Sequence, residues 1–484
     1  MELSVTCKEA STIDKISQEQ YKIPPEVLME RASLLCLPFL ERLCNENLSQ
    51  KIVFLCGKGN NGGDGLALAR LAYEKGYKNI VIALIGRNKD LSPLCTLQLA
   101  IINAMALKVE EDINTINSQL TEETIVVDGL YGTGFKGVLT DENIVLVASA
   151  NRTKGILSID IPSGMSQDSP YDALKINSTI TVTFGYKKSC FLSPNNRKNC
   201  GEIVVVNPGF PKAVLENSHV DVNILEISDF PKTTPSSFTY KNKKGHVAIF
   251  GGSPRYSGAP RLCAKGAFNS GCGLVSIVCD RDIFNVVATE SPSVIVNALD
   301  LWLSEKDKNP QYNAMALGPG WGEGREDLFK ILMTFNCPKV IDASALDLIA
   351  KFGNTSENKV IITPHTGEFI RMGFSLGSSF EDFINGPKGL KAAAKQLNAI
   401  VVLKSSVTFI TDGQMVYAFE GLNGYIGVAG SGDVLCGIIA SFLAQGMGVL
   451  EAAIKGVILH QKAGSSFGQR YFDAEELAYK VSES

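Results

Sequence analysis

The stretch KIVFLCGKGNNGGDGLALARLAYEK, residues 51–75, decides the fold of the first half of the chain. An apolar run at 51–56 is typical of a buried strand, an amphipathic segment at 66–75 is typical of a helix, and a glycine-rich turn joins the two. Five more apolar runs follow, with helical patterns such as 96–106 between several of them: 79–86, 124–128, 155–160, 179–184 and 202–206. This alternation predicts right-handed βαβ crossovers and a doubly wound parallel sheet.

The pattern loosens at residues 212–235, where prolines and polar residues collect without a sustained period and predict a linker. A second alternation then begins, with apolar runs at 246–252, 273–279, 314–320, 339–344, 359–365 and 399–405 and two closing helices at 430–446 and 450–464. Two helices at 8–20 and 25–44 precede the first alternation. The two halves do not repeat each other, so we predict an α/β protein with two different domains, residues 1–215 and 225–484.

Composition excludes several classes of protein. A net charge of −4 without long basic runs gives no general attraction to nucleic acid or to an anionic membrane. Twelve scattered cysteines without a C-x-x-C pair, and four histidines far apart, favour buried thiols over a zinc site. The N-terminus carries charges where a signal peptide needs an apolar core, and the apolar stretch 434–450 is short and interrupted by glycines. We therefore expect a buried helix there, and a cytoplasmic protein.

The turn at residues 57–65 lies where a strand ends and a helix begins. Glycines let the backbone approach an anion closely, and a helix N-terminus presents free N–H groups to it. Gly57, Gly59 and Gly62 satisfy G-x-G-x-x-G, which alone is also compatible with a hydride-transfer enzyme. However, the next strand ends at Gly86-Arg87, without the acidic residue that would hold the ribose of NAD.

Two further strand ends point to the same edge of the predicted sheet. Asp128 is followed by a second glycine loop, GLYGTGFKG (129–137), and Asp160 is followed by IPSG (161–164). In open α/β sheets, ligands bind at the carboxyl ends of the strands, so three such loops are expected to converge on one ligand. The alternative, that each aspartate only caps a turn, weakens when three loops agree.

The motifs GNNGGDG, DGLYGTGFKG and DIPSG resemble those of the NAD(P)H-hydrate epimerase family over about residues 8–211. The resemblance implies a Rossmann-like domain that binds a hydrated dinucleotide and K⁺. By position, the hydrate would contact Asn60, Asn61, Gly62, Gly63, Asp64, Gly132, Thr133, Gly134, Phe135, Lys136, Gly137, Val138 and Asp160. Potassium would be held by Asn61, Asp128 and Ser163, whose oxygens suit a hard cation. Asp160 would act as acid or base in interconverting the R and S hydrates. The departure Glu30-Arg31-Ala32-Ser33 from the usual E-N-A-G leaves these motifs intact.

In the second half, Gly430-Ser431-Gly432-Asp433 precedes a long apolar helix. Asp433 is either an ordinary helix cap or a base that takes a proton from a hydroxyl attacking a phosphoryl group. Strand-end loops that carry His365 and Lys404 favour the second interpretation.

The motifs GGSPRYSGAP, GPGWG, TPHTGE, LKSSVTFITDG and AGSGDVL resemble the ribokinase-like NAD(P)H-hydrate dehydratase family over about residues 240–475. The resemblance implies that Ala259, Gly320, His365 and Asp433 contact the hydrate, with Asp433 as base. The nucleotide would be held by Lys404, Ser405, Ser406, Val407, Thr408, Asn423, Gly430, Ser431 and Gly432. Fusion of the two domains implies ADP rather than ATP as phosphoryl donor. The resemblance also implies Mg²⁺ at this site, the hydrates of NADH and NADPH as substrates, and a homo-oligomer.

Two residues depart from this second pattern. Ser344 stands where a carboxylate is usual, and Tyr425 stands where glycine is usual. Both lie beside the expected phosphate site, so they bear on the choice of donor more than on the fold. Three other functions remain compatible with the motifs: a ribokinase-type small-molecule kinase fused to a regulatory nucleotide-binding domain, a dinucleotide sensor without turnover, and a hydride-transfer enzyme.

Overall fold

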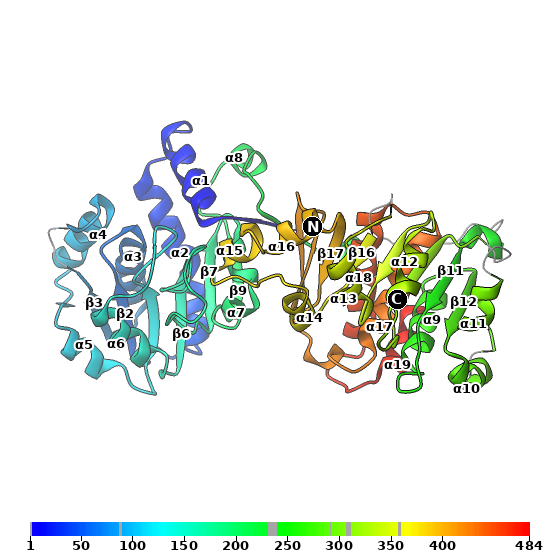
Figure 1. Cartoon of the computed structure of the whole chain (residues 1–484). Coiled ribbons are helices and arrows are strands. Elements are labelled where there is room, and N and C mark those ends of the chain that lie inside the picture. The colour runs from blue at the N-terminus through cyan, green and yellow to red at the C-terminus, as the bar shows by residue number, and fades with distance from the viewer. Residues whose placement is uncertain (1, 87–89, 231–239, 291, 306–310, 357–359) are drawn as a thin grey trace. The chain divides into compact units, whose positions relative to one another are not determined.

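The computed structural model describes residues 2–86, 90–230, 240–290, 292–305, 311–356 and 360–484. The chain divides into two compact units. The N-terminal unit comprises Leu3–Val222 together with Ser378–Glu381, and the C-terminal unit comprises Asn223–Gly377, Asp382–Ser484 and Glu2. Each unit contains a sheet and its own helices (Figure 1).

The N-terminal unit contains a parallel seven-stranded sheet in the order β4-β3-β2-β5-β6-β7-β9. The strands are β2 (Ile52–Cys56), β3 (Ile80–Leu84), β4 (Val109–Glu110), β5 (Ile125–Gly129), β6 (Gly155–Ile159), β7 (Ile180–Phe184) and β9 (Glu202–Val206). Outside this seven-stranded sheet, β1 (Glu2–Val5) pairs in parallel with β8 (Lys187–Lys188). The six strands expected from sequence all form, whereas β1, β4 and β8 are too short to produce a period.

Helices cover both faces of this sheet, as a doubly wound fold requires. They are α1 (Cys7–Glu19), α2 (Pro25–Leu43), α3 (Asn60–Lys75), α4 (Pro93–Ala104), α5 (Ile113–Gln119), α6 (Asp141–Ala150), η2 (Ser189–Leu192), α7 (Pro194–Arg197) and α8 (Lys212–Glu216). Along β2, Ile52, Phe54 and Cys56 pack with α2, α3 and α4, while Val53 and Leu55 pack with α5 and α6. Because successive strand residues point to opposite faces, every position of β2 is buried.

Helix α3 begins earlier than the sequence pattern indicated. It starts at Asn60 rather than near Leu66, so the glycine-rich motif forms its first turns instead of a loop before it. The reason is close backbone packing: a Cβ on Gly62 would lie 1.7 Å from the carbonyl oxygen of Gly57, and a Cβ on Gly57 would lie 1.9 Å from that of Leu130. Only glycine permits both approaches, and they bring the helix N-terminus to the strand ends.

The C-terminal unit has a larger, mixed sheet. Seven strands are parallel, in the order β13-β12-β11-β14-β15-β16-β17, followed by antiparallel β18 and β19. They are β11 (His246–Phe250), β12 (Leu274–Cys279), β13 (Ile295–Ala298), β14 (Ala314–Leu317), β15 (Lys339–Ile341), β16 (Val360–Ile362), β17 (Ala399–Leu403), β18 (Val407–Thr411) and β19 (Val416–Glu420). Asn223 and Ile224 of β10 (Val222–Ile224) pair in parallel with β19.

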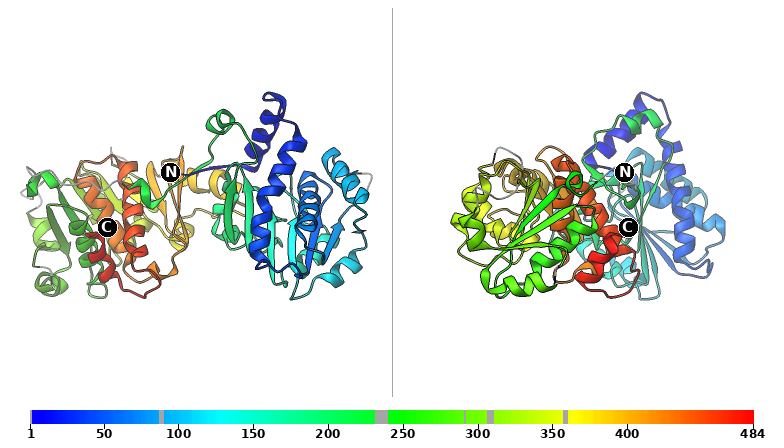
Figure 2. Two further views of the ribbon diagram at one scale, coloured as in Figure 1. Left: turned by 180° about the vertical axis from the view of Figure 1, so that it is seen from behind. Right: turned by 90° about the vertical axis from the view of Figure 1, so that its right-hand side faces the viewer.

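The helices of this unit include α9 (Ala259–Asn269), α10 (Phe284–Glu290), α11 (Leu299–Ser304), α12 (Glu326–Met333), α13 (Ala345–Phe352), α14 (Thr366–Arg371), α16 (Leu390–Gln396), α17 (Ser431–Ala444), α18 (Val449–Ser465) and α19 (Ala474–Val481). Helix α15 (Phe380–Asn385) crosses the boundary between the units, and short 3₁₀ turns lie at Ile227–Asp229 (η3), Lys241–Lys244 (η4), Arg281–Ile283 (η5) and Gly424–Ile426 (η7). Figure 2 shows α17 and α18, in orange and red, packed along the sheet of their own unit.

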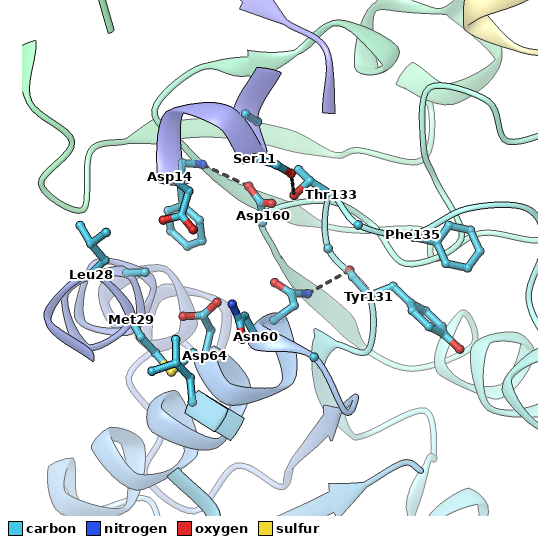
Figure 3. Close-up of a pocket in the computed structure, with 18 of the residues that line it drawn as sticks. Ser11, Asp14, Leu28, Met29, Asn60, Asp64, Tyr131, Thr133, Phe135 and Asp160 are labelled. Carbon is cyan, nitrogen blue, oxygen red and sulfur yellow. Dashed lines mark hydrogen bonds between the residues drawn. The ribbon is translucent and has the colours of Figure 1, made fainter. Parts of the chain in front are cut away.

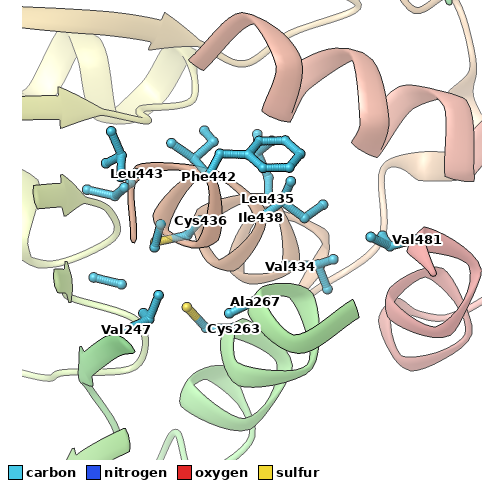
Figure 4. Close-up of a cluster of buried hydrophobic side chains, with 14 of the residues drawn as sticks. Val247, Cys263, Ala267, Val434, Leu435, Cys436, Ile438, Phe442, Leu443 and Val481 are labelled. Carbon is cyan, nitrogen blue, oxygen red and sulfur yellow. The ribbon is translucent and has the colours of Figure 1, made fainter. Parts of the chain in front are cut away.

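Helix α17 is buried on nearly every side, which confirms the prediction of a buried helix at the apolar stretch (Figure 4). It lies unusually close to α9, because a Cβ on Gly437 would be 1.9 Å from the carbonyl oxygen of Cys263, and a Cβ on Gly266 would be 2.4 Å from that of Val434. The interface is completed by small residues such as Ala267. This tight contact holds the N-terminus of α17 in place, where the phosphate motif lies.

The prediction of two different α/β units, the first of them doubly wound, is confirmed. The expected linker at 212–235 contains regular structure, since α8, β10 and η3 fall within it, and residues 231–235 lie outside the described part of the chain. All twelve cysteines are buried and free. Within the described residues, no helix is both long and apolar enough to cross a membrane.

Candidate functional sites

The N-terminal unit contains a cavity of about 750 Å³ at the carboxyl ends of β2, β5 and β6. Ten of the residues predicted to contact a hydrate line it: Asn60, Asn61, Asp64, Gly132, Thr133, Gly134, Phe135, Lys136, Val138 and Asp160 (Figure 3). Gly62 and Gly63 lie behind the wall, where their missing Cβ atoms make room for Gly57 and for the side chain of Met29. Gly137, with φ of +79°, turns the loop without lining the cavity.

Asp160 lies in the cavity wall with an unfavourable backbone conformation, and an ion pair orients its side chain. Its φ of +65° lies in the left-handed region, which is unfavourable for an aspartate and occurs often at functional sites. The buried Lys188 donates through Nζ to Asp160 Oδ1 at 2.6 Å, to Thr183 Oγ1 at 2.8 Å and to the carbonyl of Phe184 at 3.0 Å. The lysine therefore has three hydrogen-bond acceptors, and the aspartate has a fixed orientation.

The three residues predicted to bind potassium lie close together near the backbone of Tyr131. They are Asn61, Asp128 and Ser163. Asn61 Nδ2 donates to the Tyr131 carbonyl at 2.9 Å, and the Tyr131 amide donates to Ser163 Oγ at 3.0 Å. Ser163 Oγ donates to Asp128 Oδ1 at 2.5 Å, and the Ser163 amide donates to Asp128 Oδ2 at 2.9 Å. Burial raises the pKa of the Asp128 carboxyl, and the hydrogen bonds from Ser163 oppose that shift. Every candidate ligand in this cluster is an oxygen, as a hard monovalent cation requires.

Two more carboxyl groups face the same cavity. Burial raises the pKa of Asp64 well above its ordinary value, and the nearby Asp160 and Asp14 add to the shift. Burial also raises the pKa of Asp14, although Gln18 Nε2 donates a hydrogen bond to its Oδ2 at 2.7 Å. The cavity therefore contains three carboxyl groups and one buried ammonium. In such surroundings a carboxyl group is protonated more readily than it is in water.

In the C-terminal unit, the strand-end loops form a continuous row of neighbours. A Cβ on Gly318, after β14, would lie 1.9 Å from the carbonyl oxygen of Asp342, after β15. Lys404, after β17, donates through Nζ to Asp342 Oδ1 at 3.0 Å. A Cβ on Gly432, at the start of α17, would lie 3.1 Å from that same Nζ. The glycine therefore lets the helix N-terminus approach the ion pair.

Asp433 lies at this junction in the first turn of α17. Burial raises its pKa to about 7, the carboxylates of Asp342 and Glu368 push in the same direction, and Lys404 opposes them. Burial lowers the pKa of Lys404, but Asp342 and Glu368 outweigh burial and raise it overall. Asp433 thus changes charge near neutral pH beside a fixed ammonium and a helix N-terminus, which together suit proton removal next to a phosphoryl group.

The predicted hydrate contacts of this unit lie along the same row. A Cβ on Gly320 would be 3.0 Å from Cβ of Ala259, the first residue of α9, so these two residues are neighbours. His365 caps α14: its Nδ1 accepts hydrogen bonds from the amides of Gly367 and Glu368, and the backbone amide of His365 donates to Glu368 Oε2. The imidazole is exposed, and its Nε2 lies 3.5 Å from Glu368 Oε2.

The predicted nucleotide segment is partly built into the sheet. Val407 and Thr408 are buried in β18, while Ser406 is exposed and Ser405 Oγ donates to the Val407 carbonyl at 2.5 Å. Asn423 Oδ1 accepts from the amide of Tyr425 at 3.0 Å. Gly430 has φ of +91°, and Ser431 Oγ lies 3.2 Å from Nε2 of the buried His460.

The two residues that depart from the family pattern have different surroundings. Tyr425 packs edge-on against the exposed Tyr471, with ring centroids 5.0 Å apart. Ser344 Oγ is buried and forms no hydrogen bond with the described residues.

Sequence reasoning missed Lys188 and Asp14 in the first site, and Asp342 and Glu368 as partners in the second. Lys188 follows β7 after a turn, in YKK, and Asp14 interrupts the apolar face of α1, but neither position carries a motif. Their importance comes from contacts between segments distant in sequence.

Fold and sites together define a two-site α/β enzyme that handles phosphorylated nucleotides. Residues 247–483 match the family model for NAD(P)H-hydrate dehydratase, and residues 25–190 match the model for the YjeF-related protein N-terminus. A bifunctional NAD(P)H-hydrate repair enzyme of Dictyoglomus turgidum is 32% identical, covering 94% of this chain and 92% of its own length. One of Moorella thermoacetica is 30% identical, over 98% and 94%. The chain therefore belongs to the family of bifunctional NAD(P)H-hydrate repair enzymes.

A solved structure resembles the C-terminal half. The ADP/ATP-dependent NAD(P)H-hydrate dehydratase from Bacillus subtilis, co-crystallised with ATP and Mg²⁺, is 25% identical with a TM-score of 0.49. The similarity covers 54% of this chain and 97% of that one.

Proposed function

We propose that this enzyme repairs hydrated NADH and NADPH at two sites. The domain of residues 1–215 interconverts the R and S hydrates, and the domain of residues 225–484 dehydrates the S hydrate at the expense of ADP. The observation that carries the proposal is Asp433, a carboxyl with pKa near 7 in the first turn of α17 and beside the Lys404–Asp342 ion pair. Such a group suits proton removal from a hydroxyl during phosphoryl transfer.

In the dehydratase step, ionised Asp433 accepts the proton of the hydrate hydroxyl as that oxygen attacks the β-phosphorus of ADP. AMP leaves, and elimination of inorganic phosphate from the phosphorylated hydrate restores the dihydronicotinamide double bond. The amides of the α17 N-terminus and the Lys404 ammonium face the anionic group, where positive charge stabilises the transition state. Ala259, Gly320 and His365 would hold the hydrate, and residues 404–408, Asn423 and 430–432 would hold the nucleotide.

Magnesium fits this site as a companion of the nucleotide. No cluster of three or more His, Cys, Asp or Glu side chains able to hold a metal ion occurs among the residues that the structure describes. Mg²⁺ commonly keeps waters and binds through substrate phosphates with one or two carboxylates. Asp342 would supply such a carboxylate, and the ion would neutralise charge on the phosphates.

Potassium fits the epimerase site because oxygen ligands surround a buried carboxylate there. Asn61, Asp128 and Ser163 would bind it, together with the carbonyl of Tyr131 that contacts Asn61 and Ser163. A monovalent cation would offset the desolvation of the Asp128 charge and fix the 129–137 loop that borders the cavity. Epimerisation, but not dehydration, is then expected to need K⁺.

One assay tests the proposal. The protein is mixed with acid-generated R and S hydrates of NADH, Mg²⁺, K⁺ and either ADP or ATP, and NADH absorbance is followed with product analysis. We expect recovery of NADH from both epimers, with release of AMP and phosphate from ADP. No recovery with either nucleotide rules out the dehydratase, whereas a phosphorylated product that accumulates identifies a small-molecule kinase.

A further inference from the structure

Only one of the two carboxylate oxygens of Asp160 accepts hydrogen bonds from the residues that the structure describes. Among the described residues, the hydrogen bonds to this group from Lys188 Nζ, Thr183 Oγ1 and the Phe184 amide all reach Oδ1, at 2.6, 3.4 and 3.4 Å. Lys188 is 1% exposed and has acceptors for three donors, so its ammonium has one fixed orientation. Oδ2 remains available to a ligand in the cavity, next to the ammonium of Lys188.

Asp64 has opposite surroundings in the same cavity. It lies in the first turns of α3 and lines the wall, yet its side chain makes no hydrogen bond or ion pair within the part of the chain that the structure describes. The other charged groups of the wall do not pair with it. Lys188 is bonded to Asp160, Lys58 and Lys136 are exposed, and Asp14 and Asp160 are carboxyls. Figure 3 shows Asp64 and Asp160 entering the cavity from different elements, α3 and the end of β6.

We propose that Asp64 and Asp160 are the acid–base pair of the epimerase site, with Asp64 protonated and Asp160 ionised at the start of the reaction, and that Lys188 is a positioning residue which fixes Asp160. This assignment rests on the proposed epimerase function. Two carboxyl groups whose environments differ in this way take separate acid and base roles in other enzymes.

The step balances without any further reactant. Asp64 gives its proton to the hydroxyl at C6, the C6–O bond breaks, water departs and the N1 lone pair forms an N1=C6 bond. A second water adds to the opposite face of C6, the electron pair returns to N1, and Asp160 accepts the proton of that water. Solvent exchange resets the two carboxyls, and the reverse reaction uses the same pair with the roles exchanged.

The test is conversion of isolated R hydrate to S hydrate without ADP, so that the dehydratase contributes nothing. We expect Asp64→Asn, which keeps the size of the side chain, to lower kcat by about 10²- to 10⁴-fold with little change in KM. The comparison variant is Asp14→Asn, which removes a neighbouring carboxyl that already has Gln18 as partner. Its loss is expected to stay below about 10-fold. Equal losses in both variants would show that the charge of the cavity matters rather than the Asp64 proton, and would overturn the pair.

Lys188→Met tests the positioning role, and Lys188→Arg tests its rescue. We expect the first to lower kcat by about 10- to 100-fold, and the second to restore most of it, because a guanidinium also pairs with Asp160. If Lys188→Met does not fold, Lys188→Arg alone decides: retained KM with a kcat within about 10-fold supports the role, and a rise in KM with unchanged kcat contradicts it.

Turnover in H₂¹⁸O tests the chemistry of the pair. Each inversion is expected to place solvent oxygen at C6, and inversion without ¹⁸O would overturn the proposed bond breaking. If the wild-type protein does not interconvert the epimers at all, the proposed function itself fails. If it does so and Asp64→Asn retains the full rate, only the acid–base pair is wrong.

Discussion

The two sites combine the same charged groups in different ways. Each has a buried or half-buried lysine bonded to an aspartate, Lys188 to Asp160 and Lys404 to Asp342, and each has a second carboxyl without a cation bonded to it. In the N-terminal unit the paired aspartate faces the cavity. In the C-terminal unit the paired aspartate is 4% exposed, and the unpaired Asp433 occupies the helix N-terminus.

This difference shows that an aspartate's role depends on its partner and not on its motif. Asp160 forms a direct ion pair with Lys188, while Asp433 keeps a pKa near 7 because burial and two carboxylates outweigh the attraction of Lys404. The first arrangement suits a base whose carboxylate is held in one orientation by its partner. The second suits a base whose affinity for a proton is matched to neutral pH, where transfer in both directions is easy.

Loss of the unpaired base is expected to have the largest effect. Asp433→Asn should lower dehydration by about 10²- to 10⁴-fold, because the amide cannot accept the proton of the attacking hydroxyl. NADH recovery from the S hydrate measures this loss, and the rate of epimerisation in the same sample serves as the control. If epimerisation stops as well, the picture of two independent sites is wrong.

Loss of the paired base is the reciprocal experiment. Asp160→Asn should lower epimerisation by about 10²- to 10⁴-fold while the S hydrate is still consumed rapidly with ADP. Asparagine tolerates the left-handed backbone of this position, so the loop should keep its shape. Thermal unfolding checks that point, since the change leaves the Lys188 charge with a neutral partner. Rapid consumption of both epimers by this variant would contradict the assignment.

The raised pKa of Asp433 also predicts a dependence of stability on pH. Its pKa is about 7 in the folded protein and near the ordinary 3.8 of an aspartate in an unfolded chain, so the folded state binds more protons between these pH values. Stability should therefore fall as pH rises from about 4 to about 7, and Asp433→Asn should remove that loss. At pH 8 the variant should be more stable by at most about 4 kcal/mol, with no difference below pH ~4. Urea unfolding at both pH values measures this.

The dehydration rate should show the opposite trend. Because Asp433 must be ionised to accept a proton, the rate is expected to rise with pH through about 7. A rate that falls through this range, with an unchanged binding constant for ADP, would remove Asp433 from the role of base.

The smallest effect is expected at Tyr425. Its ring packs against Tyr471 and the core of the C-terminal unit, and an aromatic pair contributes about 0.5–1.5 kcal/mol beyond burial. Tyr425→Gly should raise the KM for ADP by less than about 10-fold and leave kcat nearly unchanged. Tyr471→Ala, which removes the exposed partner, is the matched control. A large drop in kcat for Tyr425→Gly would place this residue in the phosphoryl-transfer step instead.

Much of the architecture follows from local sequence. The strands at 51–56 and 246–252, the helices at 8–20 and 25–44, and the buried helix at Gly430–Gly446 are all present, because buried strands and amphipathic helices leave periodic patterns. Short or irregular elements such as β1, β8 and the antiparallel pair β18–β19 were missed. The pairing of β1 with β8 joins segments distant in the chain, which no short window of sequence contains. The β18–β19 hairpin is local, and its two strands are separated by a short turn.

The sequence by itself determined which loops bear glycines and carboxyls, since strand ends and helix starts can be recognised from residue type. It placed Asp128 and Asp160 at the carboxyl ends of strands and Asp433 at the start of a helix. Only the tertiary structure decided their ionisation and partners. Lys188 reaches Asp160 across 28 residues and Lys404 reaches Asp342 across 62, and the burial that raises the pKa of Asp64 and Asp433 exists only in the packed fold. Charge state depends on the nearest groups in space, and those are set by packing.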